Sequence, residues 1–207
     1  MANHVNTYVN FERINDAGKA VLEQLYSRIR PRDDKYERNH YEWFPDIWGL
    51  DTDITDKYDW TIDNIGPKWC YFEDRQETEF HLVSAWSPPI QGLQWLFDRI
   101  GEVDNNFIAS VQYDDEGLNF YGAQVYTSEG VSDEFEDDYD ELVNDLTDSV
   151  EELKQLKENH TDEEEEWTDS DEFHDIFNDN AWTYTSDRQY EFIRETVEWI
   201  KEEEENA

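Results

Sequence analysis

Cysteine, glycine, proline and positive charge are all scarce in this sequence. A single cysteine, Cys70, excludes an intrachain disulfide and a cysteine-rich metal site. No apolar run approaches the roughly 20 residues that a membrane-spanning helix needs. The N-terminus also lacks the basic and apolar segments of a secretory signal. These absences lead us to expect a cytosolic protein.

The shortage of positive charge restricts the possible partners. Sixteen Lys and Arg stand against 54 Asp and Glu, so the formal net charge is -38. Direct binding to nucleic acid needs clustered Lys and Arg to neutralise phosphates, and an anionic membrane surface needs them too. Both partners are therefore disfavoured, whereas basic proteins and cations remain.

The chain nevertheless has the composition of a folded protein. Apolar residues make up 37% and aromatic residues 15%, whereas disordered segments are poor in aromatics. The acidic excess is uneven, with a net of −13 over residues 1–130 and −25 over residues 131–207. We therefore expect two regions: an α+β domain over 1–130 and an acidic helical extension over 131–207.

The first region alternates between strand-like and helix-like patterns. Val5, Thr7, Val9 and Phe11 alternate with polar residues, as in a half-buried strand. Similar patterns predict the order β-α-β-β-α-β-β, with an aromatic-rich insertion over residues 32–66. The expected elements are strands near 5–11, 69–72, 80–86, 107–113 and 118–126, and helices that end at Pro31 and Gly101. This order suits an antiparallel sheet with helices on one face.

The second region is patterned as helices. Apolar residues follow a four-three spacing, which predicts one long amphipathic helix with a narrow apolar seam. The seam residues are Phe135, Tyr139, Leu142, Leu146, Leu153 and Leu156. An acidic connector over 161–167 follows. Ser170 then predicts the start of a short helix, and Ser186 with Gln189 that of a last helix.

Three short blocks resemble a known family. Gly66-Pro67-Lys68-Trp69, Ser84-Ala85-Trp86-Ser87-Pro88-Pro89 and the block from Tyr113 to Gly122 resemble the YubB-type ferredoxin-like family of phage and plasmid proteins. The family typically has Trp-Gly-Thr-Lys-Trp in the first block, where Ile65 and Pro67 depart from the pattern here. The resemblance implies a ferredoxin-like fold, a mobile-element origin and a location in the host cytoplasm. It implies no established chemistry.

Catalytic signatures are missing. The five histidines (His4, His40, His81, His160 and His174) show no metal-ligand spacing, and no phosphate-binding loop or nucleophile elbow is present. Asp51, Asp53, Asp56 and Asp59 suggest a calcium loop, but the required glycine and final glutamate are absent, so a solvated turn is favoured. We predict a protein without enzyme activity, metal or cofactor.

The Ala-Trp-Ser-Pro-Pro block has two interpretations. In one, Trp86 and Trp69 form a platform for a ligand or peptide. In the other, Trp86 is a core residue of a strand and the prolines begin a helix. Strand alternation favours the second interpretation.

The acidic extension supplies the functional hypothesis. Eleven carboxylates between Asp133 and Glu152 would lie along about 30 Å of helix, a charge density comparable with duplex DNA. We predict a phage accessory protein whose acidic surface mimics DNA, so that it binds and inhibits a basic, nucleic-acid-binding host protein such as a nuclease or a transcription component. The predicted contact residues are Asp137, Asp138, Asp140, Glu141, Asp145, Asp148, Glu151, Glu152, Glu163, Glu164, Glu165 and Glu166.

Other interpretations stay open. The acidity serves only solubility or salt adaptation in one of them. In a second, the chain is a structural protein that forms a homodimer through the 135–156 helix. A third is a cation-dependent enzyme that uses clustered carboxylates.

Overall fold

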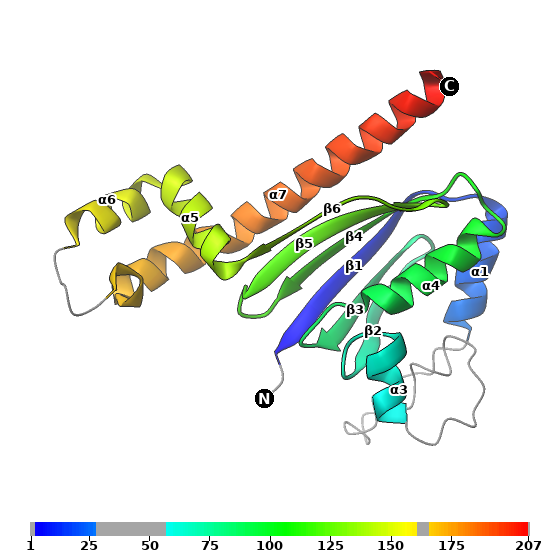
Figure 1. Cartoon of the computed structure of the whole chain (residues 1–207), viewed down its shortest axis with the longest axis horizontal. Coiled ribbons are helices and arrows are strands. Elements are labelled where there is room, and N and C mark those ends of the chain that lie inside the picture. Colours follow the sequence, from blue (N-terminus) through cyan, green and yellow to red (C-terminus); the bar gives the residue numbers. More distant parts are fainter. Residues whose placement is uncertain (1–2, 28–56, 161–165, 207) are drawn as a thin grey trace.

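The computed structural model describes residues 3–27, 57–160 and 166–206 (Figure 1). Six strands form one open antiparallel sheet in the order β2-β3-β1-β4-β5-β6. They are β1 (His4–Arg13), β2 (Cys70–Arg75), β3 (Glu79–Ala85), β4 (Ile108–Asp115), β5 (Phe120–Thr127) and β6 (Gly130–Asp138). The predicted α+β class and antiparallel sheet are confirmed. The whole chain does not have the βαββαβ order of a ferredoxin-like domain, because β5 and β6 extend the sheet.

The helices lie on both faces of this sheet. They are α1 (Asp16–Tyr26), α3 (Lys57–Asn64), α4 (Ile90–Gly101), α5 (Tyr139–Ser149), α6 (Glu151–Asn159) and α7 (Asp171–Asn206), with a 3-10 turn η2 at Trp167–Asp169. Figure 1 shows α1 and α4 on one face and α7 across the other. The prediction that the helices of residues 1–130 pack on one face is confirmed for α1 and α4, whereas α7, from the predicted extension, lies on the other face. Most of the insertion predicted over 32–66 lies outside the described residues.

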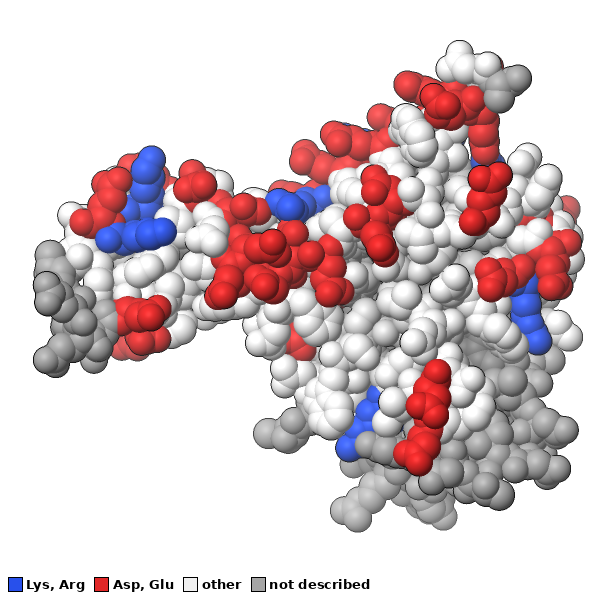
Figure 2. All heavy atoms as spheres, in the orientation of Figure 1, with Lys and Arg blue, Asp and Glu red and all other residues white. Residues whose placement is uncertain are grey.

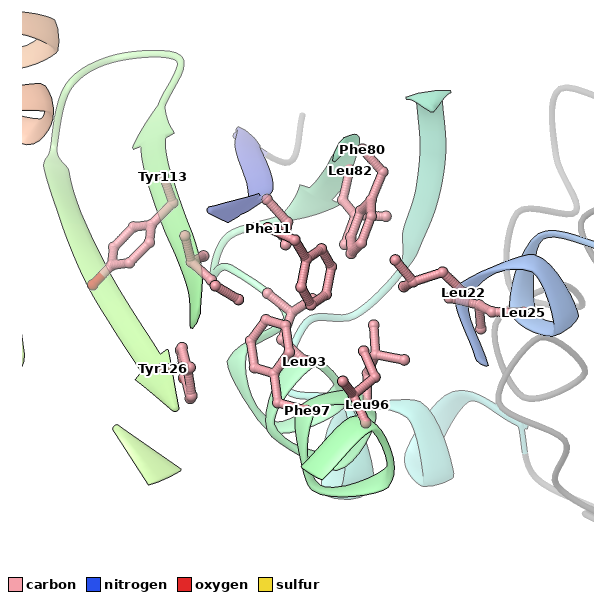
Figure 3. Packing of buried hydrophobic residues seen from close by; sticks show 14 of the residues in the cluster. Phe11, Leu22, Leu25, Phe80, Leu82, Leu93, Leu96, Phe97, Tyr113 and Tyr126 are labelled. Atoms are coloured by element: carbon pink, nitrogen blue, oxygen red, sulfur yellow. The ribbon is translucent and has the colours of Figure 1, made fainter. Parts of the chain in front are cut away.

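One face of the sheet packs against α1 and α4. Asn15 begins α1 by accepting a hydrogen bond from the Gly18 amide at 2.9 Å, which satisfies one of the free donors of the first turn. Helix α4 presents Leu93, Leu96, Phe97 and Ile100 at helical spacing. Figure 3 shows Leu93 and Phe97 next to Phe11 of β1 in the same core. This core holds the β2-β3-β1-β4 part of the sheet on the two helices.

The opposite face of β4 and β5 packs against α7. Ile193, Val197 and Ile200 form a cluster with Ile108, Ala123 and Val125. The buried residues of α7 recur every fourth position: Phe173, Phe177, Ala181, Thr185, Gln189, Ile193 and Val197. A spacing of four advances about 40° per step around a helix of 3.6 residues per turn. The buried stripe therefore winds around α7, which packs on α5 and α6 with its first half and on the sheet with its second.

The single long helix predicted across residues 135–156 is wrong. Residues 130–138 form strand β6, in which Phe135 lies opposite Ala123 of β5. A capping box between Asp138 and Glu141 then begins α5, and Val150 in an extended conformation separates α5 from α6. The four-three spacing does mark buried positions, because three leucines of the seam are buried. They pack against α7 of the same chain and do not lie on one continuous helix (Leu142, Leu146 and Leu153).

The residues assigned to the extension thus supply an edge strand and the helix that packs on β4 and β5. The two helices predicted from Ser170 and from Ser186 are one continuous helix, α7. Ser170 does accept a hydrogen bond from the Phe173 amide, as a capping residue would. Within residues 3–27, 57–160 and 166–206, no helix combines the length and apolar character needed to cross a bilayer.

Candidate functional site: an acidic lobe and an open sheet face

Acidic residues greatly outnumber basic ones where the chain projects from the sheet. We define the acidic lobe as residues 139–160 and 166–182, which comprise α5, α6, η2 and the first third of α7. These residues contain thirteen Asp and Glu and only two basic residues, Lys154 and Lys157. Figure 2 shows acidic atoms over the lobe and along α7 toward the C-terminus. The lobe therefore carries a negative field over a surface with few cations.

Four of the predicted contact residues have structural partners. Asp138 accepts a hydrogen bond from the Glu141 amide at 3.0 Å, and Glu141 accepts one from the Asp138 amide at 3.1 Å. Asp137 and Asp145 both form ion pairs with Arg188, at 2.7 and 2.8 Å. These carboxylates stabilise the junction between β6 and α5, so only part of their charge is available to a partner.

The other described contact residues are exposed. Asp140, Asp148, Glu151, Glu152 and Glu166 lie on the surface of the lobe. The Glu151 carboxylate accepts a hydrogen bond from Gln155, and no ion pair involving these five is found within the described residues. Glu163, Glu164 and Glu165 lie outside the described residues. The structure thus brings together a smaller set of solvent-facing carboxylates than the sequence predicted.

Arg188 of α7 joins the lobe to the sheet. Its guanidinium reaches Asp137 of β6 and Asp145 of α5 and lies 5.4 Å from the centre of the Phe135 ring. The hydroxyl of Tyr121 donates to Asp137 at 3.0 Å. Burial and the neighbouring Asp137 raise the pKa of Tyr121, so the phenol stays protonated as a donor. A single cation therefore holds three elements together in an otherwise acidic region.

Helix α7 also displays large aromatic side chains to solvent. Trp182, Tyr190 and Trp199 are all exposed, Tyr190 at 62%. The helix carries twelve carboxylates and three basic residues, and two of those twelve, Glu195 and Glu204, form ion pairs within the described chain. Exposed aromatics among unpaired carboxylates are typical of a protein-binding surface.

A groove that the sequence did not predict lies on the part of the sheet that α7 leaves open. Its volume is about 270 Å³. It is lined by Tyr8, Val9, Asn10, Asp74, Arg75, Gln76, Glu79, Phe80, His81, Ser110 and Gln112. Tyr8 and His81 stack with ring centres 4.3 Å apart, and Tyr8 is 45% exposed. The sequence did contain a signal, because Tyr8 is an aromatic residue at a position of β1 that alternation assigns to the polar face.

Hydrogen bonds fix the ring of His81. Asn6 donates its amide hydrogen to Asp114 at 3.1 Å, so its carbonyl oxygen faces His81 Nε2 at 3.2 Å. His81 Nε2 therefore carries the proton, which leaves Nδ1 as an acceptor in the neutral ring. Burial lowers the pKa of His81, opposed by the charges of Glu73 and Asp74.

The interpretation of Trp86 as a core strand residue is wrong. Strand β3 ends at Ala85, and Trp86 is 53% exposed with a φ of 69°, a left-handed conformation that is strained for a tryptophan. Its amide donates to the Asn3 carbonyl, and the Lys68 ammonium lies 4.9 Å from its ring centre. The blocks containing Lys68 and Trp86 are thus adjacent, and the platform of Trp86 and Trp69 remains a hypothesis.

The structure shows the surroundings of the single cysteine and of part of the suggested calcium loop. The Cys70 thiol is fully buried, and burial raises its pKa well above the ordinary value, which favours the protonated form. Within the described ranges, no group of three or more His, Cys, Asp or Glu side chains is arranged to hold a metal ion. Asp59 lies in helix α3, whereas the other three aspartates of the suggested calcium loop are outside the described residues.

Comparisons with known proteins add no relative: no family model, curated protein or solved structure matches the chain.

Proposed function

We propose that this chain is a phage accessory protein that binds and inhibits a basic host protein through the acidic lobe and α7. The observation that carries the proposal is the thirteen-to-two excess of acidic over basic residues on the lobe. A field of this sign attracts Arg- and Lys-rich surfaces and accelerates their association. A nuclease or a component of transcription has such a surface, because both bind phosphates.

The charge density favours electrostatic attraction over a close copy of DNA. Helix α7 carries twelve carboxylates on 36 residues, about 54 Å of helix at ~1.5 Å per residue. That is roughly one charge per 4.5 Å, against about one per 1.7 Å of duplex axis. The bend between β6 and α5 also removes the straight acidic helix that the mimicry hypothesis assumed. The partner is therefore proposed to recognise the lobe as an acidic protein surface.

The mobile-element origin and the ferredoxin-like ancestry belong to the same proposal. Strands β2, β3, β1 and β4 are adjacent in that order, with α1 and α4 in the crossover connections, and this arrangement supports a split βαβ unit. Strands β5 and β6 and helices α5–α7 would then be additions to that unit. The resemblance of the three sequence blocks supports the phage or plasmid source.

The test compares two variants with equal changes of charge. The first replaces exposed carboxylates of the lobe (Asp140→Asn, Asp148→Asn, Glu151→Gln and Glu152→Gln). The matched control replaces four exposed carboxylates on α1, α3 and α4 and at the residue that follows α4 (Glu23→Gln, Asp63→Asn, Asp98→Asn and Glu102→Gln). Each immobilised protein captures partners from host lysate over a salt series.

We expect the wild type and the control to retain a basic partner at low salt, and the lobe variant to lose most of it. Rising salt should release the partner, because screening weakens attraction between exposed charges. The purified partner should then lose its own activity when the wild-type chain is added. Equal capture by all three proteins, or equal loss from both variants, would contradict a role for the lobe.

A further inference from the structure

The groove and α7 lie on the same face of the sheet. Tyr8 of β1 lies opposite Gln112 of β4, and Gln112 lies opposite Ala123 of β5. Residues directly opposite each other on neighbouring strands point to the same face. Because Ala123 packs against α7, Tyr8 and the groove face the same side as the acidic helix. A partner docked along α7 could therefore reach the groove.

Several hydrogen-bond donors around the groove are already engaged. The Asn10 amide donates to Glu12 at 2.6 Å, and the Ser110 hydroxyl lies 3.2 Å from the same carboxylate oxygen. His81 donates to Asn6, and Arg75 donates to the Tyr26 carbonyl at 2.6 Å. The side-chain donors of Asn10, Ser110, His81 and Arg75 are thus engaged within the protein, and the other lining donors are the neutral groups of Gln76, Gln112 and Tyr8.

The acceptors carry negative charge. Asp74 and Glu79 line the groove, and Glu12 lies beneath Asn10 and Ser110. The only lining cation is Arg75, whose guanidinium is held against the Tyr26 ring at 5.3 Å as well as by the Tyr26 carbonyl. His81 Nδ1 adds a neutral acceptor. A complementary ligand must therefore donate hydrogen bonds and carry positive charge.

Size and shape select among cationic ligands. A volume of about 270 Å³ is below the roughly 300–1,000 Å³ of pockets for drug-sized molecules, so a single side chain is the suitable occupant. Tyr8 offers an exposed ring as one wall. A planar guanidinium stacks on such a ring and donates through a fixed fork, whereas an ammonium group is more strongly hydrated.

We propose that this groove binds the guanidinium of an arginine side chain from a basic protein partner, stacked on Tyr8 and hydrogen-bonded to Glu79 and Asp74. The proposal depends on the proposed function only for the source of the arginine. A nucleobase is the other ligand that stacks on aromatic residues of a sheet. The surrounding carboxylates repel its phosphates, so the charge favours arginine.

The test uses the full chain, labelled with ¹⁵N, and N-acetyl-arginine amide as the probe. The lysine analogue and a short single-stranded RNA serve as competing ligands. We expect saturable shifts of amide signals at Tyr8, His81 and Gln112, with weaker binding of the lysine analogue. Shifts spread over the acidic lobe, equal binding of lysine, or binding of the RNA at Tyr8 in place of arginine would overturn the proposal.

Variants separate the contribution of the Tyr8 ring from that of the carboxylates of Glu79 and Asp74. Tyr8→Ala should weaken arginine binding roughly 2- to 5-fold, whereas Tyr8→Phe should retain it because the ring remains. Glu79→Gln with Asp74→Asn should weaken binding roughly tenfold, and Glu23→Gln on α1 should have no effect. Unchanged affinity in both groove variants would overturn the assignment even if arginine binds. Tyr8→Phe keeps the test valid if Tyr8→Ala fails to fold.

The two proposals fail separately. Arginine binding in the groove without capture of a partner by the lobe would leave the groove proposal standing and remove the proposed function. Capture of a partner by the lobe without arginine binding would support the proposed function and remove the groove proposal.

Discussion

The two faces of the sheet are covered by different kinds of helix. Helices α1 and α4 are short, and each buries a stripe that recurs at the helical period, as Leu93, Phe97 and Ile100 do on α4. Helix α7 is 36 residues long and buries every fourth residue, so its stripe winds from the lobe to the sheet. The first face is a core that local sequence defines, whereas the second depends on contacts between distant parts of the chain.

The two sets of helices also differ in how much of the sheet they cover. Helices α1 and α4 pack on a core that includes residues from β1 to β5, whereas α7 contacts mainly β5 and β4. The remainder of the α7 face carries polar and aromatic side chains, among them the Tyr8–His81 pair, and holds the groove. The α1 and α4 face therefore holds the larger core. The α7 face combines a smaller core with the surfaces proposed for binding.

Truncation of a core residue on each face tests whether they unfold together. Phe97 lies 4.5 Å from Tyr126 and 5.8 Å from Phe11 by ring centres, and Phe97→Ala should lower the free energy of unfolding by about 3–5 kcal/mol. Ile193→Ala on α7 should lower it by about 2–4 kcal/mol. Urea unfolding followed by circular dichroism and tryptophan fluorescence should show one transition for both variants. A separate transition that only Ile193→Ala shifts would show that α7 is an independent unit.

Replacement of the cation at the joint between the lobe and the sheet tests how firmly they are connected. Arg188→Gln removes the pairs with Asp137 and Asp145 and leaves two carboxylates near each other, so it should lower the free energy of unfolding by about 1–2 kcal/mol. Added salt should reduce this loss, because screening weakens the repulsion.

The matched control for this prediction is Arg194→Gln. Arg194 is exposed and pairs at 3.5 Å with its neighbour Glu195, so its replacement should change stability by less than about 0.5 kcal/mol. Equal losses for the two variants in urea unfolding would mean that general charge, and not the joint at Arg188, determines the effect.

The α1 and α4 face could largely be predicted from the sequence. Its strands alternate at a period of two, α1 begins at the cap Asn15 and α4 shows apolar residues at helical spacing, so local patterns were sufficient. The order of elements from β1 to β5 was predicted for the same reason. The start of β6 was missed because Gly130 resembles a boundary and the following residues are mostly acidic.

The α7 face could not be predicted in the same way. Gln189 looked like part of a capping box, yet it lies inside α7 and donates to the carbonyls of Tyr113 and Gly122 at 2.9 and 3.0 Å. Only the folded sheet places those carbonyls opposite it. Similarly, the groove combines residues from β1, β2, β3 and β4 with Gln76 of the β2–β3 turn, and no sequence spacing brings them together.

The capping box of α5 tests the boundary that the sequence misplaced. Asp138→Ala removes the side chain that accepts from the Glu141 amide and should lower the free energy of unfolding by about 1 kcal/mol. Asp138→Asn retains an acceptor and should cost less than about 0.5 kcal/mol. Thermal unfolding measures both. Equal losses would indicate that the negative charge at Asp138 matters and its hydrogen bond does not.

The smallest expected effect concerns His81 on the open part of the α7 face. Partial burial lowers its pKa, although Glu73 and Asp74 on β2 oppose the shift, and its ring contacts Tyr8 and Asn6. An NMR titration of the His81 ring, assigned with His81→Gln, should give a midpoint below the ordinary 6.5. Because the folded pKa is the lower one, the stability linked to this group is complete above pH 6.5 and is lost as pH falls through the folded value. A midpoint at or above 6.5 would mean that the charges of Glu73 and Asp74 outweigh the effect of burial, and the groove would then lack the neutral acceptor that distinguishes this face from the α1 and α4 face.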